Sequence, residues 1–118
     1  MRKLALAIVA VALTAVTVLA ADVAGTWNVD GDVVGNPVKF TTVWKQDGEK
    51  LSGTATLEGK DIPVTGSVKD KSVTFEFDND HEGTTYHLVF TGTLGDDGGL
   101  KGSIAVAGVE GTFTAAKQ

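Results

Sequence analysis

The feature that most constrains this chain is the alternation of apolar and polar residues that begins after Asp22. In the segment Val38–Trp44, every second residue is aromatic or β-branched, and most of the residues between them are polar. Alternation places successive side chains on opposite faces of a strand, whereas a helix repeats its apolar residues every three or four positions. We therefore expect strands with one buried face each, and no helix beyond Asp22.

Eight segments show this pattern. They are the segment around Trp27 and Val29, then Val38–Trp44, Leu51–Leu57, Ile62–Val68, Val73–Asp78, Tyr86–Leu94, Leu100–Val106 and Val109–Phe113. Turn signals separate them, and the longest polar connection runs from Asp78 to Thr84. Short connections favour a meander in which sequence neighbours pair. Because closure removes both exposed edges, we predict an all-β fold, an eight-stranded antiparallel up-and-down β-barrel.

The first 20 residues differ in composition from the rest. A charged pair, Arg2-Lys3, precedes an uninterrupted apolar or small run, Leu4–Ala20, and Val18 and Ala20 suit the −3 and −1 positions of a cleavage site. This predicts a secretory signal peptide over residues 1–20 and one exported barrel domain over residues 21–118, periplasmic or extracellular. The alternative is a membrane anchor, but the run is shorter than the roughly 20 residues of a spanning helix.

Composition limits the function. The chain has no cysteine, which excludes a disulfide scaffold. Cleavage after residue 20 would remove two positive charges and change the formal charge from −5 to −7. That charge disfavours nucleic acid and anionic membranes as partners. Because the outward positions are mostly polar, we expect a monomer with no membrane association once the signal peptide is removed.

Groups suited to catalysis or metal binding are scarce. The two histidines are separate, since His81 lies in the polar connection and His87 points outward if its neighbours point inward. The run Asp78–Gly83 matches the first half of a calcium loop, but position twelve is Val89 and strands flank the run. A solvated hairpin loop explains it better, although the sequence leaves cation binding open. We expect no enzyme, no metal site and no cofactor.

The inward face is both glycine-rich and aromatic. The inward glycines, Gly53, Gly66, Gly92, Gly102 and Gly111, either leave room for a ligand or mark bends in a tightly curved sheet. The candidate ligand-binding residues are the large inward side chains Phe40, Trp44, Phe75, Phe77, Tyr86, Leu88 and Phe90. Their bulk indicates a largely filled core or a narrow pocket at one end.

The start of the domain, Gly25-Thr26-Trp27, resembles the G-x-W signature on the first strand of the calycin group, the lipocalins and avidins. In those barrels the tryptophan packs across one end of the interior, and a basic residue of the last strand lies over it. Lys117 follows Phe113 and Ala115 in the same phase. The resemblance therefore implies a barrel-end plug of Trp27 and Lys117. The chain is shorter than most lipocalins and has too few tryptophans for an avidin-type biotin site.

Two functions fit this sequence. The resemblance implies a non-catalytic binding module, in which the barrel or its open mouth holds a small apolar ligand. The alternative is a packed structural or protein-interaction barrel with no interior ligand. The sequence leaves the choice between them open, together with the identity of any ligand.

Overall fold

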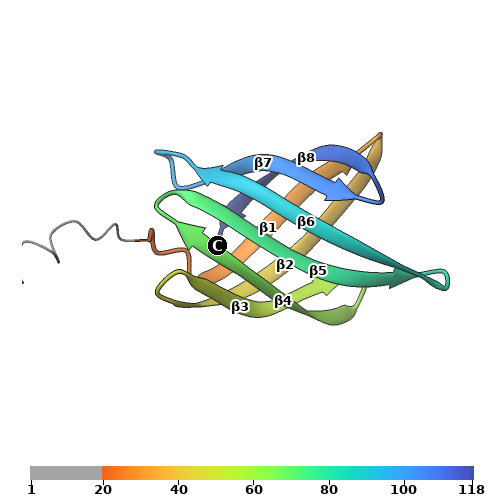
Figure 1. Ribbon diagram of the computed structural model, residues 1–118, viewed down its shortest axis with the longest axis horizontal. Helices are drawn as coiled ribbons and strands as arrows, with labels where there is room; N and C mark the ends of the chain where they lie inside the picture. Colours follow the sequence, from red (N-terminus) through yellow and green to blue (C-terminus); the bar gives the residue numbers. More distant parts are fainter. Residues whose placement is uncertain (1–19) are drawn as a thin grey trace, which may run out of the picture.

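The protein forms a closed barrel of eight antiparallel strands in a computed structural model that describes residues 20–118; the predicted signal peptide, except for its last residue, lies outside the described residues. The strands are β1 (Gly25–Val33), β2 (Asn36–Asp47), β3 (Lys50–Leu57), β4 (Lys60–Lys69), β5 (Ser72–His81), β6 (Thr84–Leu94), β7 (Leu100–Val106) and β8 (Val109–Lys117). Each strand pairs with the next, and β8 returns to β1 (Figure 1). The described residues contain no helix. The predicted fold is confirmed.

The alternation of the sequence decides which side chains fill the barrel. In β1, for example, Trp27, Val29 and Val33 are buried, while Asn28 and Asp30 between them are exposed. The same pattern recurs in the other strands, and the buried side chains meet in one apolar core. Every strand thus has one face in the core and one face toward solvent, as its sequence predicts.

Four of the five inward glycines lie where the backbone of a neighbouring strand comes very close. An ideal Cβ atom at Gly53 would fall 1.9 Å from the carbonyl oxygen of Val43, and one at Gly102 would fall 1.9 Å from that of Thr91. The same approach, at 2.2 Å, occurs at Gly66 and Gly111. Neighbouring backbone already occupies the space that a side chain would need. These contacts favour the interpretation of the glycines as bends in a tightly curved sheet.

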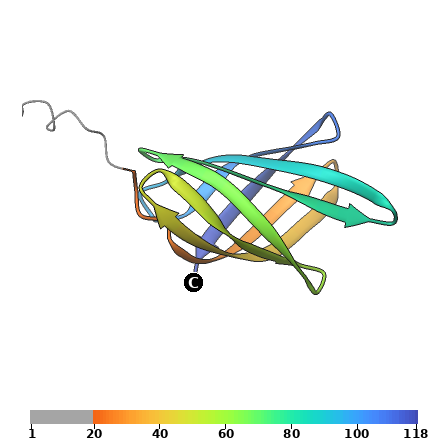
Figure 2. The ribbon, with the colours of Figure 1, turned by 60° about the horizontal axis from the view of Figure 1, so that its bottom comes forward.

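At one end of the barrel, four hairpins project beyond the core: β1–β2, β3–β4, β5–β6 and β7–β8. All four close with a two-residue turn in which a residue with positive φ precedes a glycine with positive φ, the arrangement of type I′ turns. The turns are Val34-Gly35, Glu58-Gly59, Glu82-Gly83 and Ala107-Gly108. Two views show the four tips spread apart at this end (Figures 1 and 2). We call this end the mouth.

The hairpins separate because neighbouring strands stop pairing before they reach the tips. In the described sheet, residues Lys60–Val64 of β4 have no partner on β5, and residues Asn36–Phe40 of β2 have none on β3. Both prolines of the chain, Pro37 and Pro63, lie in these segments, which are paired within their own hairpins but not with the neighbouring hairpin. Proline has no N–H group to donate, so it suits an unpaired edge and discourages pairing there.

The prediction of a loop between Asp78 and Thr84 is wrong. Strand β5 continues to His81, β6 begins at Thr84, and the ladder between them extends to the pair His81↔Thr84. This part of the hairpin lies beyond the barrel core, so both of its faces carry polar residues. Without an apolar face, the strand has no alternation of hydrophobicity for sequence analysis to detect.

The glycine contacts predict the effect of adding a single methyl group. Replacing Gly53 or Gly102 by alanine forces a Cβ atom against a neighbouring backbone, and we expect unfolding free energy to fall by about 1 to 3 kcal/mol or more. Gly99→Ala is the control, because its nearest contact would be an ordinary 3.4 Å. Urea unfolding of the three variants measures the difference. Equal stabilities would show that the strands do not meet as closely as described.

Candidate functional site

The end opposite the mouth is closed by the segment that precedes β1, Ala20–Ala24 (Figure 1). Val23 is fully buried there, and two side chains fix its backbone. Its N–H donates to Oε1 of Gln46 at 2.7 Å, and its carbonyl accepts from Nε1 of Trp27 at 2.9 Å. Gln46 also donates to the carbonyl of Ala21 at 2.8 Å. These contacts hold the segment against this end of the barrel, which we call the closed end, with Val23 in the core.

The predicted plug residues Trp27 and Lys117 are neighbours across β1 and β8. Trp27 is buried, and the centre of its ring lies 5.4 Å from that of Trp44. Lys117 is exposed and its side chain passes over Gly25, where an added Cβ atom would meet its Cε atom at 2.8 Å. Sequence analysis missed Val23, which joins the core at this end and is hydrogen-bonded to the Trp27 ring.

The middle of the barrel is filled by aromatic rings. The rings of Phe75 and Phe90 stack with centres 4.6 Å apart and planes 5° apart. Trp44 packs on Phe75 at 4.8 Å, while Phe40 and Phe77 contact Phe90 at 5.4 and 5.6 Å. Five of the seven candidate ligand-binding residues therefore contact one another. Such contacts are typical of a packed core.

A pocket of about 660 Å³ lies at the mouth, between the hairpins. Its apolar wall comes from Val33, Val38, Leu57, Tyr86, Leu88 and Val106. Its polar lining comes from Asn36, Lys39, Glu58, Asn79 and His81. The volume falls in the range of about 300 to 1,000 Å³ that is usual for small-molecule sites, and an apolar wall with a few polar groups is their usual composition.

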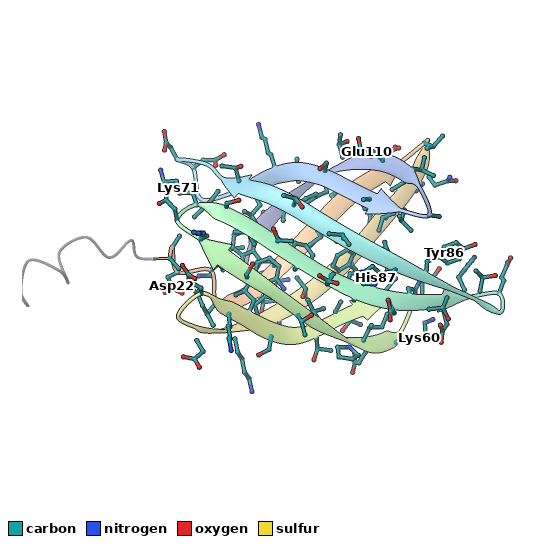
Figure 3. All side chains as sticks on the ribbon, viewed as in Figure 1. Asp22, Lys60, Lys71, Tyr86, His87 and Glu110 are labelled. Carbon is teal, nitrogen blue, oxygen red and sulfur yellow. The ribbon has the colours of Figure 1, made fainter. Side chains whose placement is uncertain are left out.

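Of the predicted ligand-binding residues, Tyr86 and Leu88 line this pocket, and the other five do not. Figure 3 shows Tyr86 near the tip of the β5–β6 hairpin. Sequence analysis missed Asn79 and His81, which also line it. A signal was present, because both residues continue the inward phase of Phe75 and Phe77 along β5. Because Asn79 and His81 are polar, a search for alternating apolar residues did not detect this signal.

Asn79 carries a polar atom without a partner. Its side-chain oxygen is shielded from solvent and accepts no hydrogen bond among the described residues. The residue lies opposite Tyr86 in the β5–β6 ladder, in the wall of the pocket. An unsatisfied buried acceptor costs about 1 to 3 kcal/mol.

His87, labelled in Figure 3, points outward, as expected. It lies between two carboxylates. Its Nδ1 atom is 2.6 Å from Asp78, its cross-strand partner, and its Nε2 atom is 3.0 Å from Glu76. The hydrogen bond to Asp78, followed by the charges of both carboxylates, raises the pKa of His87 above its ordinary value of 6.5. The three groups form an exposed charged cluster outside the pocket.

The run Asp78–Gly83 does not gather its oxygen atoms around one point. Alternation along β5 places Asp78 and Asp80 on the outer face, and Asn79 and His81 on the inner one. Asp80 instead accepts a hydrogen bond from Thr85 at 2.6 Å. Within residues 20–118, no group of three or more histidine or acidic side chains is arranged to hold a metal ion.

Comparison with known proteins yields no relative: no family model matches the chain, and no curated protein matches it at a significant level. In the part of the chain that the structure describes, no helix has the length and apolar character needed to cross a membrane. The barrel architecture, eight antiparallel strands in a closed meander, is consistent with a calycin-like small barrel.

The packed rings predict a large loss of stability on truncation. Phe90→Ala removes a ring that contacts four other aromatic side chains, so we expect unfolding free energy to fall by about 3 to 5 kcal/mol. Thr91→Ala, at the adjacent outward position, is the control and should cost less than about 1 kcal/mol. Urea denaturation measures both. Wild-type stability in Phe90→Ala would show that the ring does not belong to a packed core.

The His87 cluster predicts a pH dependence. Because folding raises the pKa of His87, its contribution to stability is fully present below the unfolded pKa of about 6.5, and it is lost as the pH rises through the folded pKa. We expect the stability difference between wild type and His87→Gln to shrink between pH 6 and pH 9, as measured by urea unfolding. An NMR titration should place the His87 pKa above 6.5 and lower it in Asp78→Asn. A value at or below 6.5 would contradict the cluster.

Proposed function

We propose that this domain is a non-catalytic binding module that takes a small, largely apolar molecule into the pocket at its mouth. The observation that carries the proposal is the pocket itself, about 660 Å³ in volume, with an apolar wall and polar groups at its edge. The aromatic core stays packed, so the ligand occupies the mouth and not the middle of the barrel. Tyr86 and Leu88 provide its contacts from the predicted set.

The construction of the mouth supports this proposal. The pocket lies between hairpins whose facing edges are unpaired, so their positions can adjust to a ligand without breaking the barrel ladder. The tip of the β1–β2 hairpin also exposes an apolar side chain, because Val34 is 70% exposed and adopts a φ of 51°, which is costly for a β-branched residue. Function is a common reason for such local strain.

The resemblance to calycins adds to the proposal. A closed eight-stranded meander with Gly25-Thr26-Trp27 on its first strand is consistent with a lipocalin- or avidin-type carrier. The signal-like pattern of residues 1–20 further supports an exported carrier, periplasmic or extracellular. The negative charge and the mostly polar outward positions favour a monomer that binds neither nucleic acid nor membrane. In this chain the site is displaced toward the mouth, because phenylalanine rings occupy the middle.

The alternative function is a packed structural or protein-interaction barrel that binds no small molecule. The close aromatic contacts in the middle of the barrel favour it. The two functions differ at the mouth, since only a carrier needs the pocket to remain open. An experiment that fills the pocket therefore distinguishes them.

Filling the pocket should weaken binding. We expect the neutral fluorescent probe N-phenyl-1-naphthylamine to bind the purified domain saturably, and Val38→Trp, in the pocket wall, to weaken binding by about tenfold or more, or about 1.4 kcal/mol. Val43→Trp is the matched control, because it adds the same ring to the outer face of the same strand. A fluorescence titration gives the affinities.

Two outcomes would contradict the proposal. Absence of saturable binding to the wild-type domain, with the same bare mass in native mass spectrometry after incubation with the probe, would support the packed barrel. An equal loss of affinity in Val38→Trp and Val43→Trp would show that the probe binds elsewhere. Circular dichroism of both variants establishes that they fold.

A further inference from the structure

The negative charge of the domain is concentrated around the mouth. The parts of the four hairpins nearest their tips, residues 28–41, 56–65, 76–89 and 104–114, carry nine aspartates and glutamates but only two lysines, a formal charge of −7. The rest of the described chain carries six acidic residues and six lysines, a formal charge of zero. Figure 3 shows Lys60 and Tyr86 toward the mouth, and Asp22 and Lys71 at the closed end.

The positive groups near the mouth offset little of this charge. Lys60 donates to the backbone carbonyl of Asp80 at 2.6 Å, which fixes its ammonium between the β3–β4 and β5–β6 hairpins. Lys39 lines the pocket, and it lies opposite Asp30 in the β1–β2 ladder. His81 is within 4 Å of both Glu58 and Glu82. Protonation of His87 would still leave a charge of −6 on this half.

The pocket concentrates the effect of these carboxylates. A cleft with low-dielectric walls and one sign of charge around it focuses the field toward its opening and raises the local concentration of oppositely charged ligands. The apolar wall supplies such a medium. Among the side chains that line the pocket, the charges of Lys39 and Glu58 offset each other, so the excess negative charge comes from the acidic hairpins around the opening. Carboxylates within about one Debye length, roughly 8 Å at physiological salt, act on a ligand there without touching it.

We propose that the occupant of the pocket is an apolar cation: an apolar body that enters between Val38, Leu57 and Leu88, and an ammonium or similar positive group that remains among the acidic hairpins. This inference rests on the proposed function, since it names the class of ligand for the same pocket. A fatty acid would bring a charge of the wrong sign.

Three probes with the same alkyl chain test the charge. Octylammonium, octanol and octanoate differ at one end only, and the amine is protonated at pH 7 as lysine is. Isothermal titration of the intact domain at low salt should give affinities in that order, with about tenfold or more between the cation and the anion. Raising the salt concentration should weaken the binding of octylammonium and leave the binding of octanol nearly unchanged.

A set of charge variants separates the effect of the carboxylates at the mouth from the effect of the net charge of the whole domain. The triple variant Asp30→Asn, Glu82→Gln and Glu110→Gln removes three carboxylates near the mouth that do not line the pocket and make no hydrogen bond within residues 20–118. Octylammonium should bind it several-fold more weakly, while octanol binding stays the same. The control triple variant, Asp47→Asn, Glu49→Gln and Asp96→Asn, makes the same change of charge at the closed end. It should keep most of the preference for the cation.

Each outcome decides one of the two proposals. If octanol binds as tightly as octylammonium, or octanoate binds more tightly, the pocket binds apolar molecules and the inference about charge is overturned. If none of the three probes binds and N-phenyl-1-naphthylamine fails as well, the proposed function itself is wrong. If both triple variants lose the preference equally, the preference comes from net charge and not from the mouth.

Discussion

Closure of this barrel depends on the backbone contact between neighbouring strands at its inward glycines. At Gly53 and Gly102, the carbonyl oxygen of the adjacent strand lies where a Cβ atom would be. This approach allows each strand to bend and coil tightly enough for β8 to reach β1. The small circumference in turn makes the interior narrow, and a few aromatic rings are enough to fill it. The chain therefore needs no disulfide to hold its ends together.

Because the interior is filled, the proposed binding site lies at the end of the barrel. Rings such as Phe75 and Phe90 exclude a ligand from the middle, and Val23 occupies the closed end. At the mouth, by contrast, the hairpins extend past the core and enclose space. The stable part of the molecule and the proposed site are thus separate: packing among apolar side chains holds the frame, while polar and acidic residues beyond it surround the pocket.

The sequence predicted the frame well because alternation is a direct consequence of strand geometry. It assigned all eight strands, the closed meander and the inward position of residues such as Trp44. It failed where burial does not follow alternation. The extension of β5 through Asn79 has no apolar face, and Val23 lies outside any strand and is held by Gln46, a contact distant in sequence. The pocket depends on the same extensions, so its position could not be predicted from the sequence.

The unpaired hairpin edges, with Pro37 and Pro63 in them, have a consequence for how such a protein can change. Each tip is a local hairpin whose pairing is complete within itself. Its length and side chains can therefore be altered without disturbing the register of the next hairpin. The mouth resembles a set of four replaceable loops on a fixed scaffold, comparable to the binding loops of an antibody domain. New specificities could be selected one hairpin at a time, with little cost to the folding of the barrel.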